Sequence, residues 1–394
     1  MSGKLDFWAK FSIVILMLGF LNINFFGLRI LSLLTLPCIV FIIRRSSLLD
    51  ANAFLLLLFS MSYDMITYNN SIDPQNSFIG IFFNSFTYAC VYLVGKHLFS
   101  DLNSEIRQAK FLILLATCLA IIPIYSIIEQ IFIFGFESGG RSMYLIWDRN
   151  EMLSATVIAG NLIYCTTFYS LVIGENRKGL NKKMIYLIII VALLSTICCL
   201  RLGSRTLLVL SAGSILLTLF INFKKASSFI TLIFIISVLS VVVAIFGEKI
   251  NLFTFFQDRI GSDAAGIDSA GGRSQRWEQA LNLMFTHPFG WEKDIIGFVH
   301  NFWLDIYRVS GFIPFILIML FTFNSIKYLI FFFNRRRNIN VIKFNVIINY
   351  LFVSFLLFFV EPIMDGFQLV LVFFVLLIGG LKGTLRNIFV LKNN

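Results

Sequence analysis

The sequence has few charged residues, few prolines and few histidines. Only 13% of its 394 residues are charged, and it holds just 6 Pro and 3 His. A soluble domain carries about 25% charged residues, so this chain cannot cover a core with polar surface. The same numbers exclude disorder, collagen and coiled coil. Instead, 58% of the residues are apolar, including 46 Phe. Side chains of this kind in such number indicate a lipid environment.

Apolar runs of about 16 to 25 residues recur along the whole chain, and each is long enough to cross about 30 Å of hydrocarbon. We therefore expect an all-α polytopic membrane protein with about twelve transmembrane helices. The first run is of span length and no small-residue cleavage site follows it, which favours a span over a cleaved signal peptide. The predicted spans are 7–27, 28–43, 52–67, 78–98, 111–135, 152–174, 184–200, 206–222, 229–246, 309–333, 342–360 and 366–381.

The distribution of basic residues predicts the orientation. Most Lys and Arg residues lie in alternate loops, which the positive-inside rule places in the cytoplasm together with both termini. The net charge of +11 is then mostly topological, and we expect no nucleic-acid partner. This orientation divides the chain into a transmembrane bundle over 1–246 (about nine spans), one long outer loop over 247–308 and a second bundle over 309–394 (about three spans).

Several features that would indicate other functions are missing. The six Cys all fall inside predicted spans, so no disulfide framework is expected in the loops. No inverted repeat favours a secondary transporter. Asp64 and Glu129 are ionisable groups within spans, where such groups mark functional sites by default. Both lie close to the outer ends of their spans, however, which favours hydrated positions at the membrane surface over a functional role.

Positive charge on the outer side departs from the pattern and concentrates in three places. Arg141 lies in the loop 137–151, Arg201 and Arg205 lie in the short turn after the seventh span, and the remainder lies in the long loop. Arg141 is a candidate contact for an anion, although nearby acidic residues balance its charge. We expect the long loop to hold the functional site, because it is the one extended polar segment outside the spans.

Within the long loop, the segment RSQRWEQALNLMFTHP predicts an amphipathic helix at the outer membrane surface. Trp277, Leu281 and Met284 recur at spacings of three and four residues, which places them on one helical face. Arg273 and Arg276 lie at its N-terminal end, where basic residues oppose the helix dipole and an anion is expected. The alternative is that they contact lipid phosphates or pair with nearby carboxylates.

His300 lies where the chain enters the tenth span from the outer side. Imidazole is the side chain whose ordinary pKa suits proton transfer near neutral pH, so His300 is a candidate general base. Asn301 follows it, and Asp305 and Arg308 form a helical pair that can neutralise itself. A lone His is more often structural, and that alternative stays open. Three scattered His and no Cys in the outer loops predict no metal site and no cofactor.

Guanidinium pairs on the outer face, together with one imidazole, suit an anionic lipid diphosphate whose leaving group needs charge stabilisation. At these residues the sequence resembles the O-antigen ligase and polymerase superfamily of bacterial inner-membrane glycosyltransferases. The similar segments are GSRTLLVLSAG (203–213), GGRSQRWEQALNLMFTHPFG (271–290) and HNFWLDIYRVSG (300–311). The last has the family's His-Asn pair followed by nine residues and Gly311.

The resemblance implies a metal-independent, inverting transfer of a glycan from undecaprenyl diphosphate to a sugar hydroxyl in the periplasm. By motif position, Arg205 and Arg273 would bind the diphosphate, and His300 would act as the base or orient the acceptor. Arg201, Arg276 and Asn301 lie beside these positions and are supporting candidates for substrate binding, as is Arg141. The implied partners are the lipid-linked oligosaccharide, membrane lipids and, as a further candidate, a chain-length regulator.

Three functions are compatible with the sequence. The first is an O-antigen polymerase, which lengthens the glycan on another lipid-linked repeat unit. The second is an O-antigen ligase, which moves the finished glycan to lipid A core. Pro314 stands where the ligase pattern has Gly, Thr or Tyr, and this favours the polymerase. A transporter of lipid-linked oligosaccharides is the alternative of another class, and it predicts polar residues and Pro or Gly breaks near mid-membrane.

Overall fold

A computed structural model describes residues 6–23, 27–70, 78–101, 104–136, 142–145, 148–172, 179–221 and 273–393. This part of the chain is predominantly helical, with one two-stranded antiparallel hairpin. Within it, six helical segments are long and apolar enough to cross a membrane: Gly27–Arg44, Glu105–Phe134, Lys182–Arg201, Phe312–Asn334, Val341–Val360 and Gln368–Arg386. The prediction of a helical chain suited to a membrane is confirmed at this level. The number of spans and their orientation stay predictions.

The chain forms two compact units, and each is described by itself. Unit 1 combines Met1–Gln108, Gly272–Ile339 and Ser354–Asn394. Its elements are α1 (Phe7–Leu21), α2 (Gly27–Ser32), α3 (Thr35–Arg44), η2 (Ser46–Leu48), α4 (Ala51–Asn70), α5 (Phe78–Asp101), α14 (Arg273–Thr286), α15 (Lys293–Ile296), α16 (Phe302–Ser310), α17 (Phe312–Asn334), η5 (Arg336–Asn338), α19 (Ile363–Gly366) and α20 (Gln368–Asn393).

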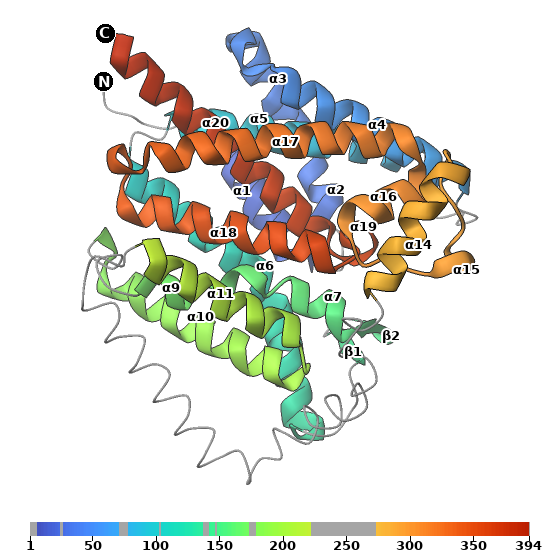
Figure 1. Cartoon of the computed structure of the whole chain (residues 1–394). Coiled ribbons are helices and arrows are strands. Elements are labelled where there is room, and N and C mark those ends of the chain that lie inside the picture. The colour runs from blue at the N-terminus through green and yellow to red at the C-terminus, as the bar shows by residue number, and fades with distance from the viewer. Residues whose placement is uncertain are drawn as a thin grey trace. The chain divides into compact units, whose positions relative to one another are not determined.

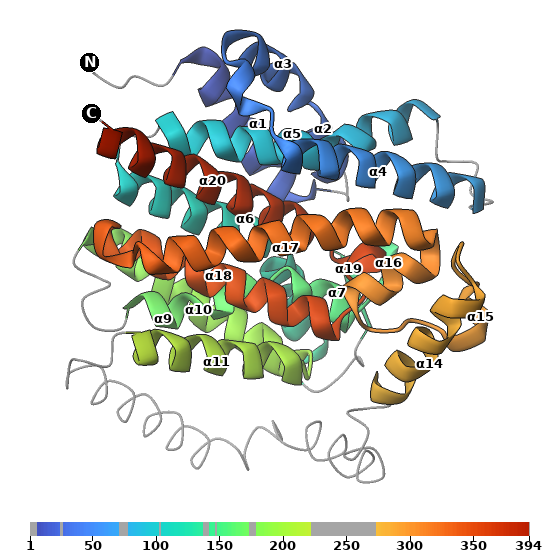
Figure 2. The same cartoon turned by 45° about the horizontal axis from the view of Figure 1, so that its top comes forward.

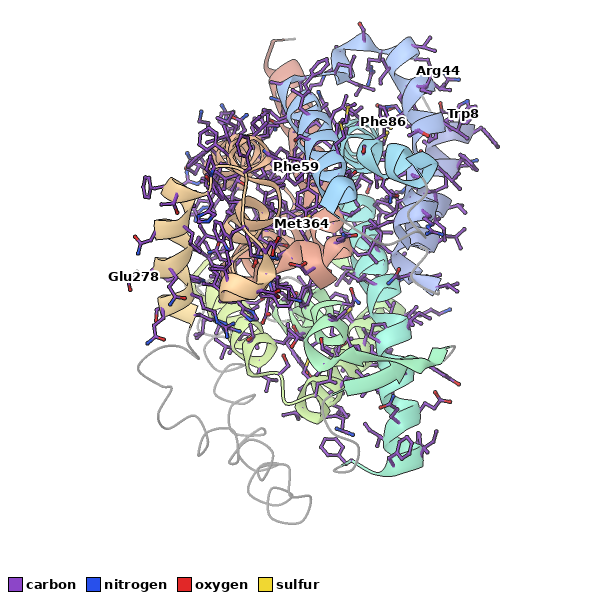
Figure 3. All side chains as sticks on the ribbon, turned by 90° about the vertical axis from the view of Figure 1, so that its right-hand side faces the viewer. Trp8, Arg44, Phe59, Phe86, Glu278 and Met364 are labelled. Carbon is purple, nitrogen blue, oxygen red and sulfur yellow. The ribbon has the colours of Figure 1, made fainter. Side chains whose placement is uncertain are left out.

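Four long helices build the core of unit 1. Helix α5 lies between α4 and α20, and α17 contacts the same two helices from the other side (Figures 1 and 2). Phe59 of α4 is fully buried in this group (Figure 3). Helices α14, α15 and α16 lie together beside the N-terminal end of α17. The long helices therefore act as a scaffold for the segment that follows the long loop.

Glycines let α5 and α20 approach closely. A Cβ placed on Gly379 would lie 2.1 Å from the carbonyl oxygen of Tyr92, and one on Gly383 would lie 2.3 Å from that of Lys96. Small residues one turn apart allow helix backbones to pack directly, as is common in membrane helices. The Lys96 ammonium is buried and lies 2.6 Å from the Asp50 carboxylate, which neutralises it.

Unit 2 combines Ala109–Gly271 with Asn340–Val353. It contains most of α6 (Glu105–Phe134) and the first part of α18 (Val341–Val360), whose last turns belong to unit 1. A polar contact joins distant segments, because Ser214 and Thr218 both hydrogen-bond to the buried Asn349 side chain. The other elements of unit 2 are β1 (Ser142–Leu145), β2 (Asp148–Ser154), α7 (Ala155–Gly160), α8 (Ile163–Thr166), α9 (Phe168–Val172), α10 (Lys182–Arg201) and α11 (Arg205–Ile221).

Two predicted spans are interrupted. The span predicted over 7–27 ends at Leu21, because Asn22 takes a left-handed conformation (φ 49°) that caps α1. The span predicted over 152–174 begins in β2 and continues as the three short helices α7, α8 and α9. The hydroxyls of Thr166 and Thr167 bond to nearby backbone carbonyls, an alternative that competes with a continuous helix.

Other boundaries also differ from the sequence prediction. The span predicted over 309–333 starts at Phe312, since Val309 and Ser310 still belong to α16 and Gly311 separates the two helices. The loop predicted over 137–151 contains β1 and most of β2, paired in an antiparallel hairpin. The predicted span 229–246 lies outside the described residues. The three-part division of the chain stays a prediction.

Candidate active site

The segment from α14 to α16 folds around a small apolar cluster. Ala280, Trp291, Val299, Leu304 and Tyr307 are its buried members, and Trp277, Leu283 and Met284 pack against it. The prediction of an amphipathic helix is confirmed, since α14 spans Arg273–Thr286. Its inner face differs from the prediction in one residue: Leu281 is 51% exposed. The helix turns Ala280 inward there, because Ala280 continues the row of Trp277 and Met284 at spacings of three and four residues.

Two glycines join the end of α14 to the end of α16. Gly290 (φ 92°) lies against the backbone of Arg308, and a Cβ there would be 2.4 Å from the Arg308 carbonyl oxygen. Gly311 (φ 73°) lies against Pro288 and Phe289, and a Cβ there would be 2.7 Å from the Phe289 Cα. Hydrogen bonds from Trp291 N–H to the Arg308 carbonyl and from Phe312 N–H to the Pro288 carbonyl complete the junction.

This junction gives the glycines a physical role. Both adopt positive φ, which glycine tolerates without a steric cost, and both allow backbone to touch backbone. Two glycine-ending patterns therefore interlock: the His-Pro-x-Gly segment that ends at Gly290, and the His-Asn pair followed by nine residues and Gly311. The second pattern begins at His300, so the junction also determines where that histidine lies relative to α14.

His300 stands on a turn that α14 holds in place. The Trp277 indole N–H donates to the Val299 carbonyl at 3.0 Å, and an Arg276 guanidinium N–H donates to the Phe298 carbonyl at 3.2 Å. Asn301 begins α16 as its N-cap, since its side-chain oxygen accepts from the Leu304 N–H at 3.2 Å. Arg276 and Asn301, which the sequence suggested as substrate-binding residues, are thus engaged in shaping the turn.

Glu361 is the residue that sequence reasoning missed. It follows α18, and its side chain is only 6% exposed. One carboxylate oxygen lies 3.5 Å from the Arg273 guanidinium, and the other lies 3.7 Å from Nδ1 of His300. Three charged or titratable side chains from three separate segments therefore meet at one point. The available signal was an ionisable residue placed directly before Pro362, at the predicted outer end of a span.

The arrangement of His300 and Glu361 suits proton transfer. Within the described residues, neither Nδ1 of His300 nor the facing oxygen of Glu361 has a hydrogen-bond partner, and both atoms are buried. The His300 side chain as a whole is 26% exposed, so its accessible atoms lie away from Nδ1. A carboxylate beside one ring nitrogen orients the imidazole and stabilises its protonated form. The other ring nitrogen, Nε2, is then free to accept a proton from a ligand.

Arg273 supplies positive charge beside this pair. Its side chain is 30% exposed, and it faces Glu361 with one nitrogen. A guanidinium has five N–H donors in a planar fork, which leaves donors for a second anion such as a phosphate group. Glu278, a nearby carboxylate on the same helix, is exposed and points away from the body of the unit (Figure 3). The site thus places a guanidinium with spare donors close to an imidazole and a buried carboxylate.

The remaining candidates belong to other segments of the chain. Arg201 is the last residue of α10 and is buried, and Arg205 is the first residue of α11; both belong to unit 2. The turn between them is closed by Ser204 N–H donating to the Cys199 carbonyl, with Gly203 at positive φ. Their predicted joint role with His300 stays a prediction. Arg141 lies outside the described residues.

No protein-family model, no curated protein and no solved structure matches this chain. Within the described residues, no group of three or more His, Cys, Asp or Glu side chains is placed to hold a metal ion. The sequence motifs and the geometry of Arg273, His300 and Glu361 are therefore the features from which a function can be proposed.

Proposed function

We propose that the protein is an O-antigen polymerase of the bacterial inner membrane, with its active site facing the periplasm. The observation that carries the proposal is the meeting of Arg273, Glu361 and His300 beside a surface helix. A cation for a diphosphate and a carboxylate-supported imidazole are the two groups that an inverting transfer from a lipid diphosphate requires. The motif resemblance supplies the substrate class.

The proposed reaction is a single displacement. His300 Nε2 accepts the proton of the acceptor sugar hydroxyl as that oxygen attacks the anomeric carbon of the donor glycan. The bond between that carbon and the diphosphate oxygen breaks, and its electron pair leaves with undecaprenyl diphosphate. Glu361 stabilises the imidazolium formed at His300, and Arg273 stabilises the negative charge on the leaving group. We assign Arg205 and Arg201 as further cations for the diphosphate.

The acceptor distinguishes the polymerase from its alternatives. In the polymerase reaction, the acceptor is another lipid-linked repeat unit, and Pro314 favours this reaction over transfer to lipid A core. A transporter of lipid-linked oligosaccharides, the alternative of another class, has no need of a base. The combination of His300 and a buried carboxylate favours an enzyme over a transporter.

The test is the lipopolysaccharide ladder of a deletion strain complemented with native or variant genes, with membrane expression checked. A polymerase predicts core carrying a single repeat unit in the deletion strain, and restoration of the ladder by the native gene. His300→Ala, Arg205→Ala and Arg273→Ala should leave the single-repeat band. His287→Ala is the matched control. Nδ1 of His287 lies 2.8 Å from the hydroxyl of the neighbouring Thr286, whereas Nδ1 of His300 faces Glu361.

The other outcomes each contradict the proposal in a recognisable way. Bare core together with long polymer held on the lipid carrier would indicate the ligase. Absence of all lipid-linked repeats from the periplasmic face would indicate the transporter. A ladder that is unchanged on deletion would exclude all three functions in this pathway.

A further inference from the structure

The backbone conformation of His300 requires an explanation. Its φ is 55°, and among the described residues only Asn22 is another non-glycine residue with positive φ. A residue with a Cβ is strained in such a conformation, so the surrounding structure must impose it. Asn visits this region readily, because its short polar side chain forms local hydrogen bonds. His300 is the other such residue, and it lies at the candidate catalytic position.

Asp305 brackets the His300 peptide from within α16. One of its carboxylate oxygens accepts from the Val299 N–H at 3.0 Å, and the other accepts from the Asn301 N–H at 3.3 Å. These two N–H groups flank His300 on either side. Asp305 is 1% exposed, so water does not compete for these bonds. Because the carboxylate is buried and accepts both bonds, it restricts the backbone conformation of the turn.

Arg308 neutralises the Asp305 carboxylate and links it to a second element. Its Nε donates to Asp305 at 3.1 Å, and a terminal nitrogen lies 3.4 Å from the Asp365 carboxylate on α19. Arg308 is itself buried, and a buried charge is tolerated only when it is paired and hydrogen-bonded. The short segment that supplies Asp365 also supplies Glu361. This one segment therefore contacts Arg308 through Asp365 and faces the His300 imidazole through Glu361.

We propose that Asp305 is a positioning residue for His300. It holds the residue in its left-handed conformation, and this turns Nδ1 toward Glu361. Arg308 and Asp365 support Asp305 in this role. The inference rests on the proposed function only in treating His300 as the base; the conformational part stands on the hydrogen bonds alone.

The kinetic test uses purified protein and lipid-linked repeat units extracted from the deletion strain. Asp305→Asn keeps one acceptor oxygen but loses the other and the charge that holds Arg308. We expect kcat to fall by about 10- to 100-fold, the range for a misplaced catalytic group, with KM for the donor within about twofold of native. The double variant with His300→Ala should be no slower than His300→Ala alone, because residues that act as a unit are not additive.

Asp365→Asn is a second, milder variant, which keeps the test informative if Asp305→Asn does not fold. It loosens Arg308 without touching the two bonds to the His300 turn, so a smaller fall in kcat, about threefold, is expected. Burial raises the pKa of Asp365 above the usual carboxyl range, even though Arg308 opposes this. Arg308 keeps its pairing with the buried Asp305 in this variant, so the fold should be retained, and thermal unfolding of the purified variant checks that lost activity is not due to unfolding.

The spectroscopic test does not depend on activity. The chain has only three His, so labelling with ¹³C,¹⁵N-histidine yields few signals, and His300→Gln identifies the one that matters. Asp305→Asn should shift the His300 Cα and Cβ resonances, which report φ, while those of His97 and His287 stay in place. Unshifted resonances would overturn the proposal, as would an Asp305→Asn kcat within twofold of native. If the resonances shift but native protein shows no polymerisation, then the proposed function fails and the positioning role stands.

Discussion

The junction between α14 and α16 makes a quantitative prediction about its glycines. Replacing Gly311 with Ala adds a methyl group at φ 73° and ψ −161°, a backbone conformation that is essentially confined to glycine and costs other residues about 1–3 kcal/mol. The new Cβ would also lie 2.7 Å from the Phe289 Cα and the Pro288 carbonyl oxygen. These are backbone atoms that no side-chain rotation can move, so overpacking adds about 1–3 kcal/mol. We expect Gly311→Ala to reduce the free energy of unfolding by about 2–6 kcal/mol.

Gly297 provides a matched control. It has a similar φ of 68°, but a Cβ there would meet no atom within 4 Å. Its ψ of −151° is also close to that of Gly311, so Gly297→Ala should lose only the conformational part, about 1–3 kcal/mol. The assay is denaturant unfolding of the purified variants in one detergent, followed by tryptophan fluorescence. Equal losses for the two variants would refute the steric reasoning, because the contacts around Gly311 are the one large difference between the sites.

Three further predictions concern the charged groups and the turn. Glu361→Gln should slow polymerisation by about 10-fold or more by removing the charge that stabilises the imidazolium, whereas Glu278→Gln should leave the rate unchanged; equal rates in a single-turnover assay would contradict this. The raised pKa of Asp365 means that the folded state holds this proton more tightly than the unfolded chain. Its contribution to stability is thus present at acidic pH and is lost as pH rises above about 4, the ordinary carboxyl pKa, so the melting temperature of Asp365→Asn relative to native should increase as pH is raised from there. Trp277→Phe keeps a ring in the apolar cluster but removes the hydrogen bond to the turn before α16, and should cost about 1 kcal/mol in the same unfolding assay.

The helical elements were largely predictable, because run length and periodicity are local properties. The helix over Arg273–Thr286 follows from the spacing of Trp277 and Met284, and α10 follows from its long apolar run. The interruptions were harder to predict. Hydropathy alone does not reveal a cap such as Asn22 or the local hydroxyl bonds that divide 152–174, since the residues involved sit inside apolar runs.

The site was predictable only in part. His300 stands out as one of only three His in the chain, and Arg273 as a basic residue at the start of a helix in a long polar loop. Asn301 carried a signal that points to a cap, an Asn directly before an apolar helix, rather than to substrate binding. Glu361 lies at the end of another span, and no periodicity links it to the loop. Its proximity to His300 arises from the packing of α16 against α19.

Taken by itself, the sequence determined the class of protein, because few charges and long apolar runs leave a lipid-embedded helical chain as the physical solution. It also determined which segment carries unusual polar residues. Only the tertiary structure decided that Glu361 faces His300, that Asp305 brackets the His300 peptide, and that two glycines lock these segments together. Such contacts join residues far apart along the chain, and their distances are set by packing rather than by any local preference of the backbone.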